Sequence, residues 1–184
     1  SITYLKMNKQ GIFSHIVLLA VCLTAVVFLT SCNSGMLSSG RTESLVFVQM
    51  SDVQLGFSDY QKDMESFGRA VAQINELNPR FVVICGDLVN DANDQSFSDF
   101  KRIKSSLQMP CYCVPGNHDI GKKPILESLR RYRETIGRDY YEVECEGSTF
   151  LFVNTQLWKE AVEGESETQD AWLKERLSVA SGKG

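Results

Sequence analysis

The chain has 184 residues, of which 43% are hydrophobic, and this is enough for one globular domain with a packed core. Its formal net charge of −4 is opposite in sign to the positive charge that general nucleic-acid-binding proteins carry, which argues against that class. No nucleic-acid partner is evident, although the net charge does not exclude a local basic patch.

The amino end has the pattern of an export signal. Residues 16–30 form an uninterrupted run of apolar or small residues, which follows Lys6 and Lys9 and is short for a membrane span. The next residues complete Leu-Thr-Ser-Cys, which resembles the lipobox of bacterial lipoproteins. We therefore expect Cys32 to become the lipidated first residue of an exported protein, anchored to a membrane of the bacterial cell envelope.

This pattern divides the chain into three parts. We expect a signal peptide with lipobox over residues 1–32, in which residues 1–6 are an artefact upstream of the start at Met7. Residues 33–43, rich in Ser and Gly, form a flexible tether, and residues 44–184 belong to the folded domain. An ordinary cleaved signal and an uncleaved anchor are the alternatives for the amino end.

From residue 45 onward, buried strands alternate with amphipathic helices. The first helix has an apolar stripe at steps of three and four, and Asn78 and Pro79 end it. A strand, helix, strand order favours parallel strands joined by right-handed crossovers. The predicted elements are strands at 45–50, 81–85 and 111–114, helices at 60–77, 94–107 and 124–136, a β-hairpin at 140–145 and 149–155, an acidic loop at 160–168 and a helix at 169–179.

Four cysteines follow the tether, and all lie in or beside predicted strands: Cys85, Cys111, Cys113 and Cys145. Free cysteine is among the most buried residue types, so we favour small core residues. Export also permits disulfides, and the alternative is a pair between neighbouring strands.

Each of the first three strands runs into a polar loop that holds a glycine. Because the carboxyl ends of parallel strands meet at one edge of a sheet, these loops should deliver their side chains to one site. Hard oxygen donors beside a histidine suit divalent or trivalent metal ions. The side chains brought together are those of Asp52, Gln54, Asp87, Asn117 and His118.

The loops read Asp-x-Gln, Gly-Asp-x-x-Asn-Asp and Gly-Asn-His-Asp, in that order. Asp87 follows Asp52 by 35 residues, and Asn117 follows Asp87 by 30. This series resembles the calcineurin-like metallophosphoesterase superfamily over about residues 45 to 177. The closest resemblance is to the branch with Gln where most members have His. It implies an α/β fold, a layered α/β/β/α sandwich.

The resemblance also implies a two-metal site, with ions drawn from Mn, Fe, Zn and Mg. Asp52 and Gln54 would bind the first ion, Asn117 the second, and Asp87 would bridge both. A metal-activated hydroxide would then attack the phosphorus of a bound phosphate ester. Because Gln54 replaces imidazole with a weaker, harder amide ligand, the identity of the metal is open.

His118 is not a ligand in the family but donates a proton to the leaving oxygen or stabilises charge at the phosphate. Asp91 is the candidate to orient it, because Asn90 stands where related protein phosphatases have an Asp. The alternative for His118 is a structural histidine bonded to its own loop. The alternative for Asp52 and the other loop residues is ordinary turn chemistry.

The further histidines that complete the family's metal site, in Gly-His and Gly-His-x-His pairs, are absent from these 184 residues. We therefore expect the sequence to be a fragment that holds the amino-terminal part of a phosphoesterase domain. The predicted function is hydrolysis of phosphomonoesters or phosphodiesters, with phosphoproteins among the candidate substrates. The alternative is a non-catalytic lipoprotein that binds a phosphate-bearing ligand or a partner protein.

Overall fold

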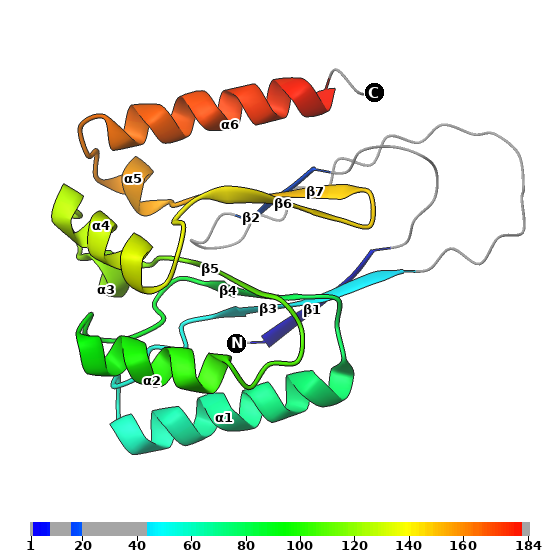
Figure 1. Cartoon of the computed structure of the whole chain (residues 1–184), viewed down its shortest axis with the longest axis vertical. Coiled ribbons are helices and arrows are strands. Elements are labelled where there is room, and N and C mark those ends of the chain that lie inside the picture. The colour runs from blue at the N-terminus through cyan, green and yellow to red at the C-terminus, as the bar shows by residue number, and fades with distance from the viewer. Residues whose placement is uncertain (1, 8–15, 20–43, 182–184) are drawn as a thin grey trace, which may run out of the picture.

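The structure is a computed structural model that describes residues 2–7, 16–19 and 44–181. Two sheets lie face to face between layers of helices, which confirms the predicted layered α/β/β/α sandwich (Figure 1). In spatial order the first sheet comprises β1 (Ile2–Met7), β3 (Leu45–Ser51), β4 (Val82–Cys85) and β5 (Cys111–Val114); the second comprises β2 (Ile16–Leu19), β7 (Ser148–Phe152) and β6 (Tyr141–Cys145).

Helices cover both outer faces of the sandwich. Figure 1 shows α1 (Tyr60–Leu77) and α2 (Asp94–Lys104) beside the first sheet, and α6 (Glu165–Ser181) beside the second. Three shorter helices lie at one end of the molecule: α3 (Asn117–Ile120), α4 (Leu126–Thr135) and α5 (Gln156–Lys159).

The core between the two sheets is aromatic. The rings of Phe47 and Phe81, on β3 and just before β4, stack with centroids 4.9 Å apart, and the edge of Phe150 from β7 packs against both. Such pairs add about 0.5–1.5 kcal/mol beyond their area burial. This packing clamps the first sheet to the second.

The strands β3, β4 and β5 run parallel and in register. Ser51 pairs with Cys85, and Cys85 pairs with Val114, so all three strands end at the same edge. The predicted parallel order is confirmed, and the three polar loops emerge side by side.

Several predicted boundaries differ from those of the structure. The helices predicted at 94–107 and 124–136 are shorter. Short helices form at α3, where a loop was expected, and at α5, for which no element was predicted. The loop predicted at 160–168 was wrong over its last four residues, because α6 already begins at Glu165. The amide of Gly164 donates to Glu167, and that of Val162 donates to Ser166. Acidic side chains in a first helical turn also interact favourably with the helix dipole.

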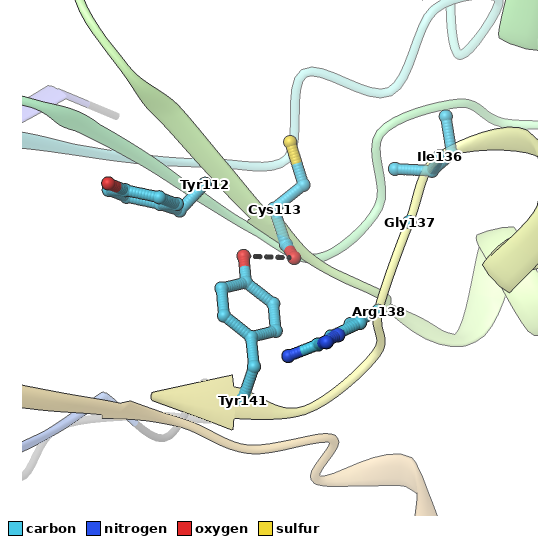
Figure 2. A pocket seen from close by; sticks show the side chains of 6 residues that line it. All are labelled: Tyr112, Cys113, Ile136, Gly137, Arg138 and Tyr141. Carbon is cyan, nitrogen blue, oxygen red and sulfur yellow. Dashed lines mark hydrogen bonds between the residues drawn. The ribbon is translucent and has the colours of Figure 1, made fainter. Parts of the chain in front are cut away.

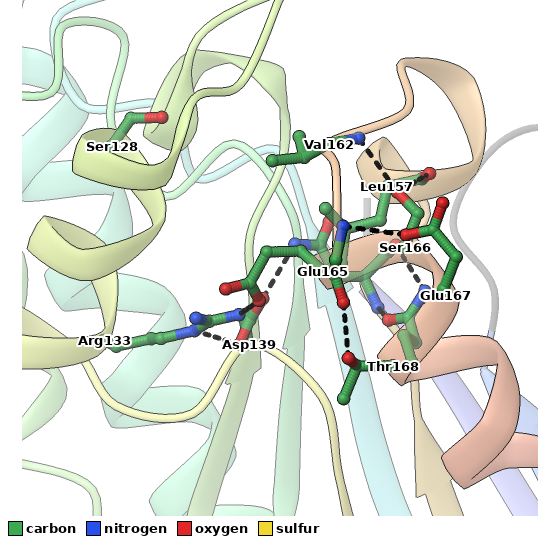
Figure 3. A network of polar contacts seen from close by, with 12 residues as sticks. Ser128, Arg133, Asp139, Leu157, Val162, Glu165, Ser166, Glu167 and Thr168 are labelled. Carbon is green, nitrogen blue, oxygen red and sulfur yellow. Dashed lines mark hydrogen bonds and ion pairs between the residues drawn. The ribbon is translucent and has the colours of Figure 1, made fainter.

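A buried polar network joins the second sheet to the surrounding helices (Figure 3). Asp139 accepts two hydrogen bonds from Arg133 of α4 and one from the side chain of Asn154, which follows β7. Arg133 also pairs with Glu165 at 2.6 Å, and Gln169 of α6 bonds both backbone groups of Asn154. The network thus positions α4, which follows the third polar loop.

Cys85, Cys111 and Cys113 are free thiols, so no disulfide joins neighbouring strands within residues 44–181, and the alternative of such a pair was wrong. Cys85 and Cys113 are buried, as predicted for small core residues. Burial raises the pKa of the Cys85 thiol to about 12, which keeps it protonated and unreactive.

The predicted lipobox at 29–32 and the predicted tether at 33–43 lie outside the described residues. The described parts of the predicted signal peptide are β1, which pairs antiparallel with β3, and β2, which pairs parallel with β7. No helix within the described ranges is long and apolar enough to cross a membrane. The signal peptide and its lipobox stay predictions.

Candidate metal centre

The three polar loops are tied to one another by backbone hydrogen bonds. The amide of Gln54 donates to the carbonyl oxygen of Asp87 at 2.8 Å, and that of Asp52 donates to Gly86 at 3.3 Å. The amide of His118 donates to Oδ1 of Asp87 at 3.0 Å. The structure therefore brings the residues predicted from the first, second and third loops to one edge of the sheet.

The backbone at this edge is strained. Asp52, Gln54 and Asp87 have φ angles of 55°, 43° and 46°, in the left-handed region that side-chain-bearing residues rarely adopt. Asp adopts this region more readily than most residues, so the cost of roughly 1–2 kcal/mol falls chiefly on Gln54. Strain of this kind clusters at functional sites, where the surrounding structure holds residues in place for a purpose other than stability.

The side chains of the three loops leave oxygen atoms available for a ligand. Within residues 44–180, no hydrogen bond or ion pair is recorded for the carboxylate of Asp52 or the amide of Asn117. Gln54 uses its nitrogen, which lies 3.4 Å from Oδ1 of Asn90, so its oxygen stays available. Two carboxylates and two amide oxygens fit a hard divalent cation. The described part of the chain holds no cluster of three or more His, Cys, Asp or Glu side chains suited to a metal ion.

Gly116 makes room for Asp87. A Cβ atom at position 116 would lie 2.2 Å from Oδ1 and 2.3 Å from the backbone nitrogen of Asp87. These distances are far shorter than any real carbon contact, so only glycine fits. This contact between Gly116 and Asp87 depends on the pairing of β4 with β5.

His118 has a defined ring orientation. Its Nδ1 lies 2.8 Å from the carbonyl oxygen of Asn90. Because a carbonyl oxygen only accepts hydrogen bonds, Nδ1 carries the proton and Nε2 is the nitrogen available for proton transfer. Asp91, predicted to orient the ring, is exposed and accepts a hydrogen bond from the Asn90 side chain at 3.2 Å. Its catalytic role stays a prediction.

The cavity lined by Tyr112, Cys113, Ile136, Gly137, Arg138 and Tyr141 is separate from these loops (Figure 2). It has a volume of about 190 Å³, and the hydroxyl of Tyr141 donates to the carbonyl oxygen of Cys113 at 2.9 Å beside it. None of the predicted metal ligands lines it. The candidate centre is therefore an open edge of the sheet, not this cavity.

Comparison with known families decides what these loops are. The family model described as calcineurin-like phosphoesterase matches residues 45–182, which include all three loops. The chain belongs to the calcineurin-like phosphoesterase family. Members of this family generally use divalent metal ions, in agreement with the oxygen donors at the sheet edge.

Two groups of relatives support the assignment. The serine/threonine-protein phosphatase CPPED1 of Homo sapiens is 33% identical over 140 residues, which cover 70% of this chain and 45% of CPPED1. The glycerophosphodiester phosphodiesterase GpdQ of Enterobacter lignolyticus is 31% identical over 119 residues, covering 61% of this chain and 42% of GpdQ. The predicted resemblance to the calcineurin-like metallophosphoesterase superfamily is confirmed, and CPPED1 is among the relatives found. The chain spans about half the length of these relatives.

Asp119 is the last residue of the third loop motif. Its side chain joins the second loop to the third, which was not predicted from the sequence. Its buried carboxylate accepts hydrogen bonds from the amides of Leu88, Val89 and Gly116, at 2.9, 3.2 and 2.8 Å. Burial raises the pKa of Asp119 to about 7, while the three donors act in the opposite direction. The sequence feature that could have pointed to Asp119 is its place next to His118 in a calcineurin-like motif. Its partners are backbone amides, which no sequence pattern marks.

We expect Asp119→Ala to destabilise the protein by about 3 kcal/mol or more, because three buried amides lose the acceptor that they share. The free energy of unfolding in urea measures the effect. Glu163→Ala removes an exposed carboxylate with no recorded hydrogen bond or ion pair, and should leave the unfolding midpoint unchanged. Equal stability of the two variants would contradict the structural role of Asp119.

Proposed function

We propose that the protein is a metal-dependent phosphoesterase that hydrolyses phosphomonoesters or phosphodiesters. The observation that carries this proposal is the convergence of four oxygen-bearing side chains from three strand ends beside the oriented ring of His118. The relatives, a phosphatase and a phosphodiesterase, support it at the level of the reaction class. A phosphoprotein is one candidate substrate, since CPPED1 is a protein phosphatase.

Each residue of the centre has a proposed role. Asp52 and Gln54 would hold one divalent ion, Asn117 a second, and Asp87 both. Ions at this place would polarise the phosphoryl oxygens and lower the pKa of a water molecule. The amide of His118 fixes the Asp87 carboxylate, and the carbonyl of Asn90 accepts from Nδ1, so that the imidazolium form of the ring would donate its Nε2 proton to the leaving oxygen.

The proposal is tested by removing the metal. We expect a chelator to abolish hydrolysis of a chromogenic phosphate ester by the full-length protein that the gene encodes, and added Mn²⁺, Fe²⁺, Zn²⁺ or Mg²⁺ to restore it. Turnover that persists in a metal-free sample would rule out the mechanism. A protein that binds phosphate-bearing ligands with metal present but never turns them over would be a binding protein, not an enzyme.

His118→Asn should lower the rate by ~10²–10⁴-fold for an alkyl phosphate, whose leaving oxygen needs a proton. The loss should be much smaller for p-nitrophenyl phosphate, because p-nitrophenolate leaves without one. Rates for both esters, measured together with the metal content, separate proton donation from metal binding. Equal losses for the two leaving groups would show that His118 does not donate the proton.

We further propose that the protein is exported and held at a membrane of the bacterial cell envelope through lipidated Cys32. The apolar run at 16–30 and the Leu-Thr-Ser-Cys sequence that it completes support this. Mass spectrometry of the mature amino end should find an acylated cysteine; an unmodified amino terminus at another residue would refute the anchor.

A further inference from the structure

Most of the exposed large apolar side chains belong to segments at the end of the molecule that carries the candidate metal centre. Figure 1 shows that the connection from β3 to α1, the start of α4 and α5 all lie at this end. Eight large hydrophobic side chains are exposed in the described part of the chain, and five of them belong to these segments: Phe57, Tyr60, Ile125, Leu126 and Trp158. Exposed apolar side chains near a functional site are candidates for an interaction surface.

Two adjacent aliphatic side chains in this group face solvent. Ile125 and Leu126 are 61% and 60% exposed, whereas Pro124 and Leu129 on either side are buried. The buried neighbours anchor the segment, so the pair is held outward by the fold and does not merely belong to a loose loop.

The position of the pair in α4 makes it more unusual. Ile125 is the N-cap of the helix, and Leu126 is its first residue. Polar residues such as Ser or Asp are strongly preferred at an N-cap, and lacking one costs about 1 kcal/mol. Helix stability therefore does not explain these residues, and neither does burial in the core.

The residues just before the pair are cationic. Lys122 and Lys123 are exposed, and no ion pair is recorded for either among residues 44–180, whereas Arg130 and Arg131 of α4 pair with acidic side chains. Exposed aliphatics next to lysines are typical of segments that lie on anionic lipid, where each lysine contributes about 1 kcal/mol.

We propose that residues 122–126, the basic–apolar segment, dock on an anionic lipid surface. The lysines contact lipid phosphates, and Ile125 and Leu126 enter the headgroup region. The aliphatic pair projects outward, whereas a peptide side chain is recognised in a concave pocket, and the cavity described above lies beside Tyr112 and Tyr141. Docking faces the candidate metal centre toward phosphate esters of the lipid surface. It does not require the protein to be an enzyme.

The test compares the partition of the full chain onto phosphatidylcholine vesicles with and without phosphatidylglycerol. For each variant we take the ratio of its affinity for vesicles with phosphatidylglycerol to its affinity for vesicles without it. The amino end is the same in every variant, so differences in this ratio report on the substituted residues. Lys122→Gln with Lys123→Gln should lower the ratio roughly 30-fold. Ile125→Asp with Leu126→Glu should lower affinity for the anionic vesicles at least about 10-fold. The same double variant should raise the unfolding midpoint, because it supplies a polar N-cap.

The matched control is Leu77→Glu with Val179→Glu, which also replaces two exposed aliphatics by acids but at the ends of α1 and α6. It should bind anionic vesicles like the wild type. Equal losses in all variants, or no loss in any, would overturn the proposal. Unchanged vesicle binding with a lower kcat/KM for a soluble phosphopeptide would also overturn it, and would make the segment a peptide-docking surface.

Discussion

Asp87→Asn is expected to lower the phosphoesterase rate of the full-length protein by ~10³-fold or more, at least the loss seen when one charge-stabilising donor is removed from an active site. Asp87 is the residue assigned to both ions, and its Oδ1 also accepts the amide of His118. An asparagine keeps an oxygen for that amide but loses the negative charge. The loop should therefore stay folded while metal affinity collapses.

The measurement is kcat/KM for a chromogenic phosphate ester together with the metal content of each protein. Asp94→Asn is the matched control, because Asp94 is an exposed carboxylate at the start of α2 whose ion pair within residues 44–180 is with Arg131. The control should keep full activity and full metal content. If the Asp87 variant did the same, the assignment of Asp87 as the shared ligand would be wrong.

Gly116→Ala is expected to destroy the same site through its backbone. The added Cβ would overlap Oδ1 and the backbone nitrogen of Asp87, so the second and third loops must separate. Separation also breaks the bonds that Asp119 accepts from the amides of Leu88 and Val89 in the second loop. We expect a loss of about 4 kcal/mol or more in unfolding free energy, the range reached when overpacking meets a broken buried network, and no measurable metal-dependent turnover.

Gly68→Ala is the control for the Gly116 variant. A Cβ at Gly68, in the middle of α1, meets no atom within 4 Å. Because glycine inside a helix is unfavourable relative to alanine, this variant should gain roughly 0.5–1 kcal/mol. A lower free energy of unfolding for Gly116→Ala and a higher one for Gly68→Ala, both measured in urea, would verify that the space around each glycine decides the effect. A Gly116 variant as stable as the wild type would contradict it.

Local sequence patterns predicted many of the helices and strands. The bounds predicted for the first helix and the third strand match α1 and β5, because a continuous apolar stripe and a short buried run are local signals. The start of α6 was missed, because its caps are side-chain bonds of Ser166 and Glu167 that outweigh the polar composition. The helical turn at α3 was also missed, since a Pro-Gly sequence predicts a turn but does not specify the conformation of the next residues.

The candidate site divides in a similar way. Asp52, Gln54, Asp87, Asn117 and His118 could be named from the sequence because each follows a strand and belongs to a family motif. The orientation of His118 could not, because its partner is the backbone carbonyl of Asn90, 28 positions earlier. Every residue has such a carbonyl, so no residue type marks the one that the fold selects.

The sequence by itself determined the order of the elements and the identity of the oxygen donors, since hydrophobic periodicity and the side-chain chemistry of three loops are properties of short segments. Only the tertiary structure decided that Gly116 must lack a side chain, that Asp119 joins two loops and that Ile125 and Leu126 face outward. The physical reason is that these properties depend on the register between strands and on which backbone groups become buried together. Register and burial are set by contacts between segments about 30 residues apart, which no local pattern contains.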